Sequence, residues 1–170
     1  RWMLRHELFA FCRRQRGAAP GLIVGIARGD RVEVACDGPG LQPSTALPVG
    51  SITKLLTAAV LLDELDRRVD GATVEQLLSH HAGLACDLPC KLAEPGRLFG
   101  YSNLGFDRAA GPDFVGRADR LLGEIGLTPR WSASLPAASG GLITDCAGLL
   151  RLGQALARVP ALVIFRGSAG

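Results

Sequence analysis

Ser51 and Lys54 stand three positions apart where a loop gives way to a run with helical periodicity. On a helix these positions share a face, and helical side chains lean toward the N-terminus, so the Lys54 ammonium can reach the Ser51 hydroxyl. The helix N-terminus favours an alkoxide at Ser51 and disfavours charge on Lys54. The pattern predicts a nucleophilic serine with a lysine that accepts its proton. The alternative is an N-capping serine followed by a surface lysine.

Tyr101 and Asn103 are the only tyrosine and the only asparagine of the chain, and they stand two positions apart. A tyrosine near an ammonium group has a stabilised phenolate and can serve as a general base or acid. An asparagine amide offers a donor and an acceptor that can orient a substrate amide or the lysine. The alternative is a turn that contains a half-buried tyrosine.

Composition narrows the class of protein. The 170 residues are 48% hydrophobic and 21% charged, which predicts a single folded domain over 1–170 and excludes a disordered chain. A net charge of +3 without a basic stripe argues against nucleic-acid binding. No apolar run approaches the roughly 18 residues of a membrane span. Five scattered cysteines and no apolar leader after Arg1 favour the cytoplasm, or a periplasmic or secreted location if a signal was removed.

Periodicity and turn residues predict the elements that must position these side chains. Two β-rich runs around Gly29-Asp30 predict an antiparallel hairpin over 22–27 and 31–35. The segment 82–100 is expected to be irregular, and 161–165 is a late strand candidate. Helices are expected over 2–16, 51–67, 73–79, 113–125 and 145–158, the last one capped by Thr144. This order is typical of an α+β fold with an antiparallel sheet and a helical cluster.

Five segments in this order resemble the serine β-lactamase and penicillin-binding protein superfamily. The likeness is to the branch that holds class C β-lactamases, D-Ala-D-Ala carboxypeptidases and related esterases. The segments are 20–30, the Ser-x-x-Lys segment 49–59, 73–84, the Tyr-x-Asn segment 99–105, and the Ser-Gly-Gly-Leu segment 139–142.

The resemblance implies a β-lactamase/transpeptidase-like fold and acyl transfer through an ester on Ser51. Lys54 would assist deprotonation of Ser51, Tyr101 would pass the proton to the leaving group, and Asn103 would orient the substrate. The Ser51 backbone N–H would supply half of an oxyanion hole. No metal or organic cofactor is implied. The substrate would be a β-lactam, a D-Ala-D-Ala or other peptidoglycan-type peptide, or a small ester.

The chain also departs from the family. A Lys-Thr-Gly or His-x-Gly triplet is expected after the helix at 145–158, but residues 159–170 contain neither lysine nor histidine. We therefore expect a shortened relative with an incomplete sheet. The rival hypothesis is a non-catalytic remnant or binding module that self-associates through an exposed sheet edge. His80, His81, Cys86 and Cys90 could be drawn as a zinc cluster, but their spacing is loose and no metal is predicted.

Overall fold

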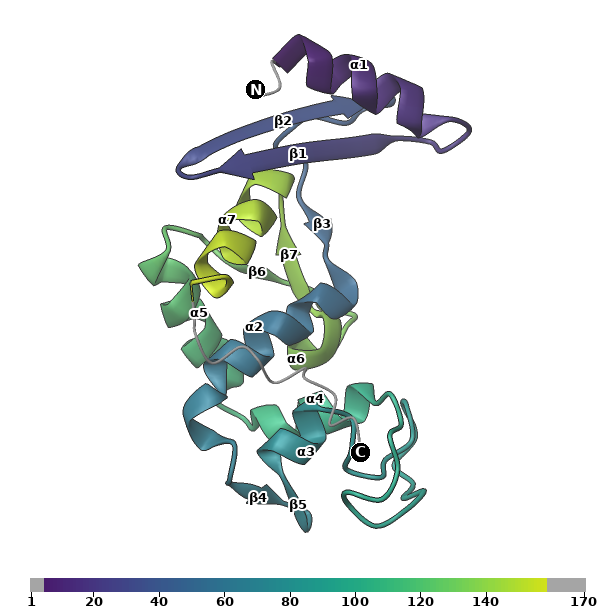
Figure 1. Ribbon diagram of the computed structural model, residues 1–170, viewed down its shortest axis with the longest axis vertical. Helices are drawn as coiled ribbons and strands as arrows, with labels where there is room; N and C mark the ends of the chain where they lie inside the picture. Colours follow the sequence, from purple (N-terminus) through teal and green to yellow (C-terminus); the bar gives the residue numbers. More distant parts are fainter. Residues whose placement is uncertain (1–4, 159–170) are drawn as a thin grey trace.

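The computed structural model describes residues 5–158. Figure 1 shows helices and short strands stacked along one long axis, with α1 and the first hairpin at one end. The α-helices are α1 (Arg5–Arg16), α2 (Thr53–Val60), α3 (Val74–Leu78), α4 (Asn103–Ala110), α5 (Phe114–Glu124), α6 (Ala137–Gly140) and α7 (Cys146–Leu156). The short 3-10 helices are η1 (Gly50–Ile52) and η2 (Leu62–Glu64). The strands are β1 (Leu22–Arg28), β2 (Arg31–Asp37), β3 (Leu47–Pro48), β4 (Arg68–Val69), β5 (Ala72–Thr73), β6 (Arg130–Trp131) and β7 (Leu142–Thr144).

The predicted hairpin is confirmed and carries α1 on one face. β1 pairs with β2 in an antiparallel register that runs from Leu22 opposite Asp37 to Arg28 opposite Arg31. Gly29 takes a φ of +57° in the tight turn, a conformation that glycine adopts without steric cost. α1 buries Leu8 and Cys12 against Ala35 of β2, so helix and hairpin share a small core of their own.

Between residues 5 and 158 the strands form three small antiparallel sheets, which confirms the predicted α+β class. β1 pairs with β2, β4 pairs with β5, and the third sheet has the order β3-β7-β6. None of these sheets closes on itself. The strand expected at 161–165 lies outside the described residues.

The long helix expected over 51–67 is wrong, because the segment is broken into η1, α2 and η2. The chain leaves α-helical geometry at Leu61, which has a φ of −103° and a ψ of 7°. The apolar residues recur at three- and four-residue steps, and a three-residue step also suits a 3-10 helix. Periodicity therefore could not show where the α-helix ends.

The predicted cap of α7 is wrong, and the predicted cap of α3 is confirmed. Thr144 does not cap α7, since it belongs to β7 and pairs with Leu47. The cap is Asp145, whose carboxylate accepts the Gly148 N–H at 2.7 Å, and a negative charge there also suits the helix dipole. At α3 the predicted capping box is present, because Thr73 and Gln76 exchange side-chain and backbone hydrogen bonds.

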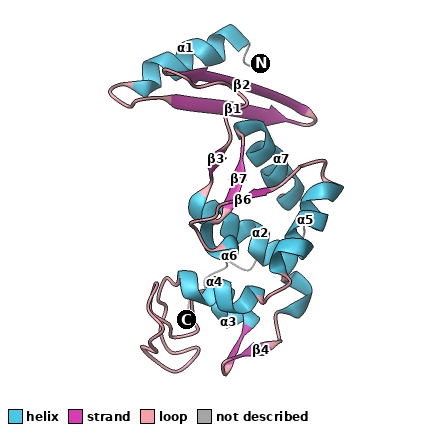
Figure 2. Ribbon diagram, turned by 180° about the vertical axis from the view of Figure 1, so that it is seen from behind, coloured by secondary structure: helices cyan, strands magenta, loops and turns pink. Residues whose placement is uncertain are grey.

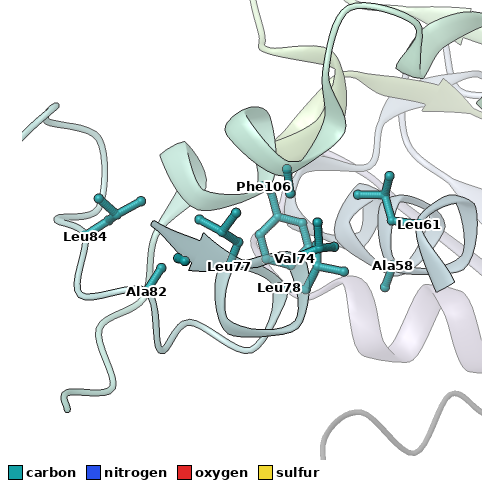
Figure 3. Packing of buried hydrophobic residues seen from close by; sticks show 10 residues of the cluster. Ala58, Leu61, Val74, Leu77, Leu78, Ala82, Leu84 and Phe106 are labelled. Atoms are coloured by element: carbon teal, nitrogen blue, oxygen red, sulfur yellow. The ribbon is translucent and has the colours of Figure 1, made fainter. Parts of the chain in front are cut away.

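α2 is the central helix and separates two hydrophobic clusters. On one side Phe106 of α4 lies among Val74, Leu77 and Leu78 of α3, as Figure 3 shows. On the other side Leu56 packs with residues of α5, β7 and α7. Each fully buried side chain of this size contributes about 1.5–3 kcal/mol to folding. Leu56 thus packs α2 against one cluster, and Ala58 and Leu61 pack the same segment against the other.

The segment 82–100 is irregular, as predicted, and Figure 2 shows it as a long loop. An isolated bridge joins Leu84 to Lys91. Gly83 has a φ of +69°, and a Cβ there would lie 2.1 Å from the Ala93 carbonyl oxygen, so only glycine fits. Backbone bonds from Gly96 to His81 and from Gly100 to the His80 carbonyl fasten the loop and lead the chain to Tyr101.

Candidate active site

Ser51 lies in η1, directly before α2. Gly50 takes a φ of +56°, which turns the chain sharply into this 3-10 turn. The neighbouring Val49 N–H donates to the Leu142 carbonyl at 2.9 Å and ties the turn to β7. Ser51 itself is exposed, and the N-cap of α2 is Ile52 rather than Ser51. Its hydroxyl therefore stands at the surface of a well-anchored turn.

Lys54 is buried beneath Ser51, so the alternative of a surface lysine is wrong. Its exposed fraction is 6%. The ammonium donates to Ser51 Oγ at 3.2 Å, to Asn103 Oδ1 at 2.6 Å and to the Ser139 carbonyl oxygen at 2.7 Å. An ammonium has three donors, and all three are used. Nζ also lies 5.0 Å from the centre of the Tyr101 ring.

Tyr101 completes the contact with the serine from across the fold. Its hydroxyl lies 2.8 Å from Ser51 Oγ, and 43% of the residue is exposed. Burial acts to raise the pKa of Tyr101, but the interactions with Lys54 and Ser51 outweigh it, so the pKa lies below that of a free phenol. The phenolate is thus easier to form here than in solution.

Asn103 is the first residue of α4 rather than part of a turn. Ser102 is the N-cap, and its hydroxyl accepts the Gly105 N–H at 3.0 Å. Asn103 Nδ2 donates to Asp87 Oδ1 at 2.7 Å, which turns its Oδ1 toward Lys54. The same bond lowers the pKa of Asp87, so this carboxylate stays ionised. In this arrangement the Asn103 amide orients the lysine.

The segment that contains Ser139 forms the opposite wall. Thr57 donates to the Ala138 carbonyl at 2.7 Å and fastens this segment to α2. A Cβ at Gly141 would lie 2.8 Å from the Ala137 Cα, so the tight turn requires glycine. The Ser139 hydroxyl donates to Asp107 Oδ2 at 3.0 Å. The carbonyl that receives Lys54 is therefore fixed on both sides.

A cleft of about 480 Å³ opens over these groups. Its lining includes the nucleophile candidate, the asparagine and both walls, and consists of Gly50, Ser51, Asp87, Asn103, Leu104, Asp107, Leu135, Pro136, Ser139 and Gly140. A hydroxyl in contact with an amine and a phenol, at the floor of a cleft, has the arrangement needed for proton removal during attack on a carbonyl.

The structure does not support the zinc alternative. Between residues 5 and 158, no group of three or more histidine, cysteine, aspartate or glutamate side chains is arranged to hold a metal. Cys86 and Cys90 are exposed free thiols. His80 Nδ1 accepts the Ser102 N–H at 3.0 Å and is turned toward the serine site instead.

The structure thus brings together all four predicted site residues, from η1, α2, the start of α4 and the irregular segment that precedes α4. It adds neighbours that sequence reasoning missed, namely Asp87, Asp107 and Ser139. Aspartates are common, so their spacing carried no signal. Ser139 lies in the Ser-Gly-Gly-Leu segment of the family resemblance, but it binds the Lys54 ammonium through its backbone carbonyl, not its side chain.

The beta-lactamase family model matches residues 10–112, which is more than half of the chain. The chain therefore belongs to this family of proteins. A comparison with curated protein sequences finds no significant match.

Solved structures show the same fold. A beta-lactamase from Mycobacterium bovis is 28% identical, with a TM-score of 0.61 over 81% of this chain and 55% of that one. A D-stereospecific amidohydrolase from a Streptomyces species is 20% identical, with a TM-score of 0.66 over 86% of this chain and 72% of that one. A class C beta lactamase is 18% identical, with a TM-score of 0.62 over 86% and 62%. The chain spans about half the length of the Mycobacterium bovis protein.

Between residues 5 and 158, no helix has both the length and the apolar character needed to cross a membrane.

Proposed function

We propose that the chain is a serine hydrolase that transfers an acyl group to water through an ester on Ser51. The observation that carries the proposal is the contact of Ser51 Oγ with both the Tyr101 hydroxyl, at 2.8 Å, and the Lys54 ammonium, at 3.2 Å. Membership of the beta-lactamase family supports it. A lone capping serine would not need a buried amine and a phenol at its hydroxyl.

In the first step, Ser51 Oγ attacks the carbonyl carbon of an amide, lactam or ester. Lys54 in its neutral form, or the Tyr101 phenolate, takes the hydroxyl proton as the new C–O bond forms. The Ser51 backbone N–H, at the start of the helical segment, would stabilise the oxyanion. Tyr101 then gives a proton to the leaving nitrogen or oxygen as the old bond breaks. Asn103 holds Lys54 in place throughout.

In the second step, water attacks the ester carbonyl of the acyl-enzyme. The same basic group removes a proton from water, and Ser51 leaves with a proton restored to its oxygen. The acyl group departs as a carboxylic acid. The substrates that fit this chemistry are β-lactams, peptides ending in D-Ala-D-Ala, and small esters.

The test is covalent labelling of the protein with a fluorescent penicillin and, separately, with a fluorophosphonate. We expect an adduct on Ser51, mapped by peptide mass spectrometry. Ser51→Ala should abolish it, and Lys54→Met should slow labelling by about 10²–10⁴-fold, the usual contribution of general acid–base groups. Ser44→Ala, a change at another exposed serine, is the matched control and should label like the parent protein.

The second candidate function is a non-catalytic binding module. A module of this kind would bind its ligand in the same cleft of about 480 Å³ without forming an ester on Ser51. Saturable binding of penicillin without an adduct at Ser51, from either reagent, would favour the module and contradict the hydrolase.

A further inference from the structure

His80 lies at a position that usually favours glycine. α3 ends at Leu78, and Ser79 is its C-cap. Two bonds close the helix, from the His81 N–H to the Gln76 carbonyl, at 2.7 Å, and from the His80 N–H to the Leu77 carbonyl, at 3.3 Å. This pattern is the Schellman cap, whose left-handed residue is most often glycine. His80 takes that place with a φ of +63°. A side chain held in this conformation against steric cost points to a use for the side chain.

The imidazole of His80 makes two contacts with the segment that carries the phenol. Nδ1 accepts the Ser102 backbone N–H at 3.0 Å. The ring lies against Tyr101, with centroids 4.5 Å apart and planes inclined by 31°. On its other sides it meets Phe106 at 5.3 Å and Phe99 at 5.9 Å. The residue is 9% exposed, so the ring is clamped between the α3 cap and Tyr101.

These contacts require the neutral imidazole. Nδ1 must be unprotonated to accept an N–H, so the proton sits on Nε2. Burial lowers the pKa of His80, and the positive charges of Lys54 and His81 lower it further. Tyr101 is the remaining titratable group against the ring. Protonation of Nδ1 would turn the Ser102 contact from an attraction into two opposed donors.

We propose that His80 is a positioning residue for Tyr101, which it supports by ring contact and by holding the Ser102 amide, so that the phenol reaches Ser51 and Lys54. The step from position to rate rests on the proposed function. The positioning itself does not, because it can be measured without any substrate.

The first measurement is the ultraviolet titration of the phenol, which reports Tyr101 alone because the chain has one tyrosine. His80→Gly removes both contacts and relieves the backbone, so the pKa of Tyr101 should rise toward that of a free phenol, about 10. His80→Asn keeps an acceptor for the Ser102 amide and tolerates a positive φ, but removes the ring. The rise in the pKa of Tyr101 should therefore be smaller in His80→Asn than in His80→Gly.

His81→Asn is the matched control. The two histidines are adjacent, but the His81 ring contacts Phe99, with centroids 5.4 Å apart, and its Nδ1 faces the Ser79 carbonyl. This variant should leave the titration of Tyr101 unchanged. Circular dichroism shows which variants are folded. If His80→Gly is unfolded, the comparison is made with His80→Asn alone. A folded His80 variant with the parental Tyr101 titration overturns the proposal. So does a rise in the pKa of Tyr101 in His81→Asn that equals the rise in the His80 variants.

The second measurement is the rate of labelling of Ser51. Misplacement of a catalytic group by about 1 Å can cost 10²-fold, so His80→Gly should label up to about a hundredfold more slowly, with His80→Asn in between. If the parent protein forms no adduct, the proposed hydrolase fails while the titration still decides the role of His80. If the adduct forms and no folded His80 variant changes the titration, only the positioning role fails.

Discussion

At the scale of single residues, the site is organised around one buried cation with neutral acceptors. Lys54 donates to a hydroxyl, an amide oxygen and a backbone carbonyl, and none of these carries a formal charge. Its field therefore acts on the Tyr101 phenol above it, which is one cause of the lowered pKa of that group. The carboxylates Asp87 and Asp107 act one step further out, through Asn103 and Ser139.

Asp107 provides a prediction at this scale. Burial raises the pKa of its carboxyl, with Ser139 opposing this in part, and its Oδ1 is buried without a partner. Because the folded-state pKa lies above the unfolded value, Asp107 favours folding at low pH, and this contribution is lost as the pH rises through the folded-state pKa. Asp107→Asn has no proton to lose, so the free energy of unfolding of this variant, relative to that of the parent, should increase as the pH rises from 4 to 8.

Urea unfolding at the two pH values measures this difference. Asp63→Asn, at an exposed position on the surface, is the control, and its gap to the parent should stay constant. A constant gap for Asp107→Asn as well would show that burial of the carboxyl does not affect its titration.

The sequence could predict the residues whose rarity and spacing carry a chemical meaning. Ser51 with Lys54, and Tyr101 with Asn103, were found in that way. It could not predict the contribution of Ser139, because a backbone carbonyl exists at every residue. Nor could it pair Asn103 with Asp87, because the irregular loop that brings them together has no periodic pattern. The sequence pattern offers His80 only as one member of a loose zinc cluster, whereas in the structure its ring lies against Tyr101.

At the scale of elements, sequence patterns succeeded where an element is long and has a local cause. The hairpin, α1, α5 and α7 lie within a few residues of their predicted bounds. The two-residue strands β3 and β6 exist only because β7 pairs with both, and such partners cannot be read from a local pattern. α4 was not among the predicted helices, although Ser102 caps it at its start.

Glu64 links η2 to α5 and, through its two arginine partners, to α2 and α4, and it provides the next prediction. Its carboxylate pairs with Arg67 Nε and Arg117 Nη2, each at 2.6 Å, and these arginines also bind the carbonyls of Ala109 and Val60. Burial acts to raise the pKa of Glu64, but the two arginines outweigh it and the pKa is lowered. All three side chains are about a third exposed, so Glu64→Gln should cost only about 1 kcal/mol at pH 7.

The pH dependence of this cost has a definite sign. A carboxyl whose pKa is depressed on folding contributes stability above its unfolded pKa, about 4.3, and the contribution is lost as the pH falls through the folded pKa. Urea unfolding should therefore show a gap between parent and Glu64→Gln at pH 7 that closes toward pH 3. Glu94→Gln removes a far more exposed pair, with Lys91, and should show almost no gap. A Glu64 gap that widens in acid would contradict this account.

At the scale of the whole molecule, residues 5–158 form three hydrophobic clusters, and α2, which carries Lys54, packs against two of them. The third, in α1 and the hairpin, lies at one end of the molecule, where Figure 1 shows α7 beneath β1. Gly25, in the middle of β1, allows β1 and α7 to approach each other closely. A Cβ at Gly25 would lie 2.6 Å from Cys146 Sγ and from Leu150 Cδ1, both on α7.

Gly25→Leu should therefore separate the hairpin from α7 without reaching the candidate site. Overpacking of this kind costs about 1–3 kcal/mol, and we expect that loss in the free energy of unfolding. Hydrogen exchange should show reduced protection in β1 and β2, while the Tyr101 titration stays parental because neither Cys146 nor Leu150 touches the site. Gly123→Leu is the control, since a Cβ at this helical glycine meets nothing within 4 Å and the change should stabilise α5 by up to about 1 kcal/mol. Full protection of the hairpin in Gly25→Leu would contradict the close contact between β1 and α7. A shifted Tyr101 titration would show that the change reaches the candidate site.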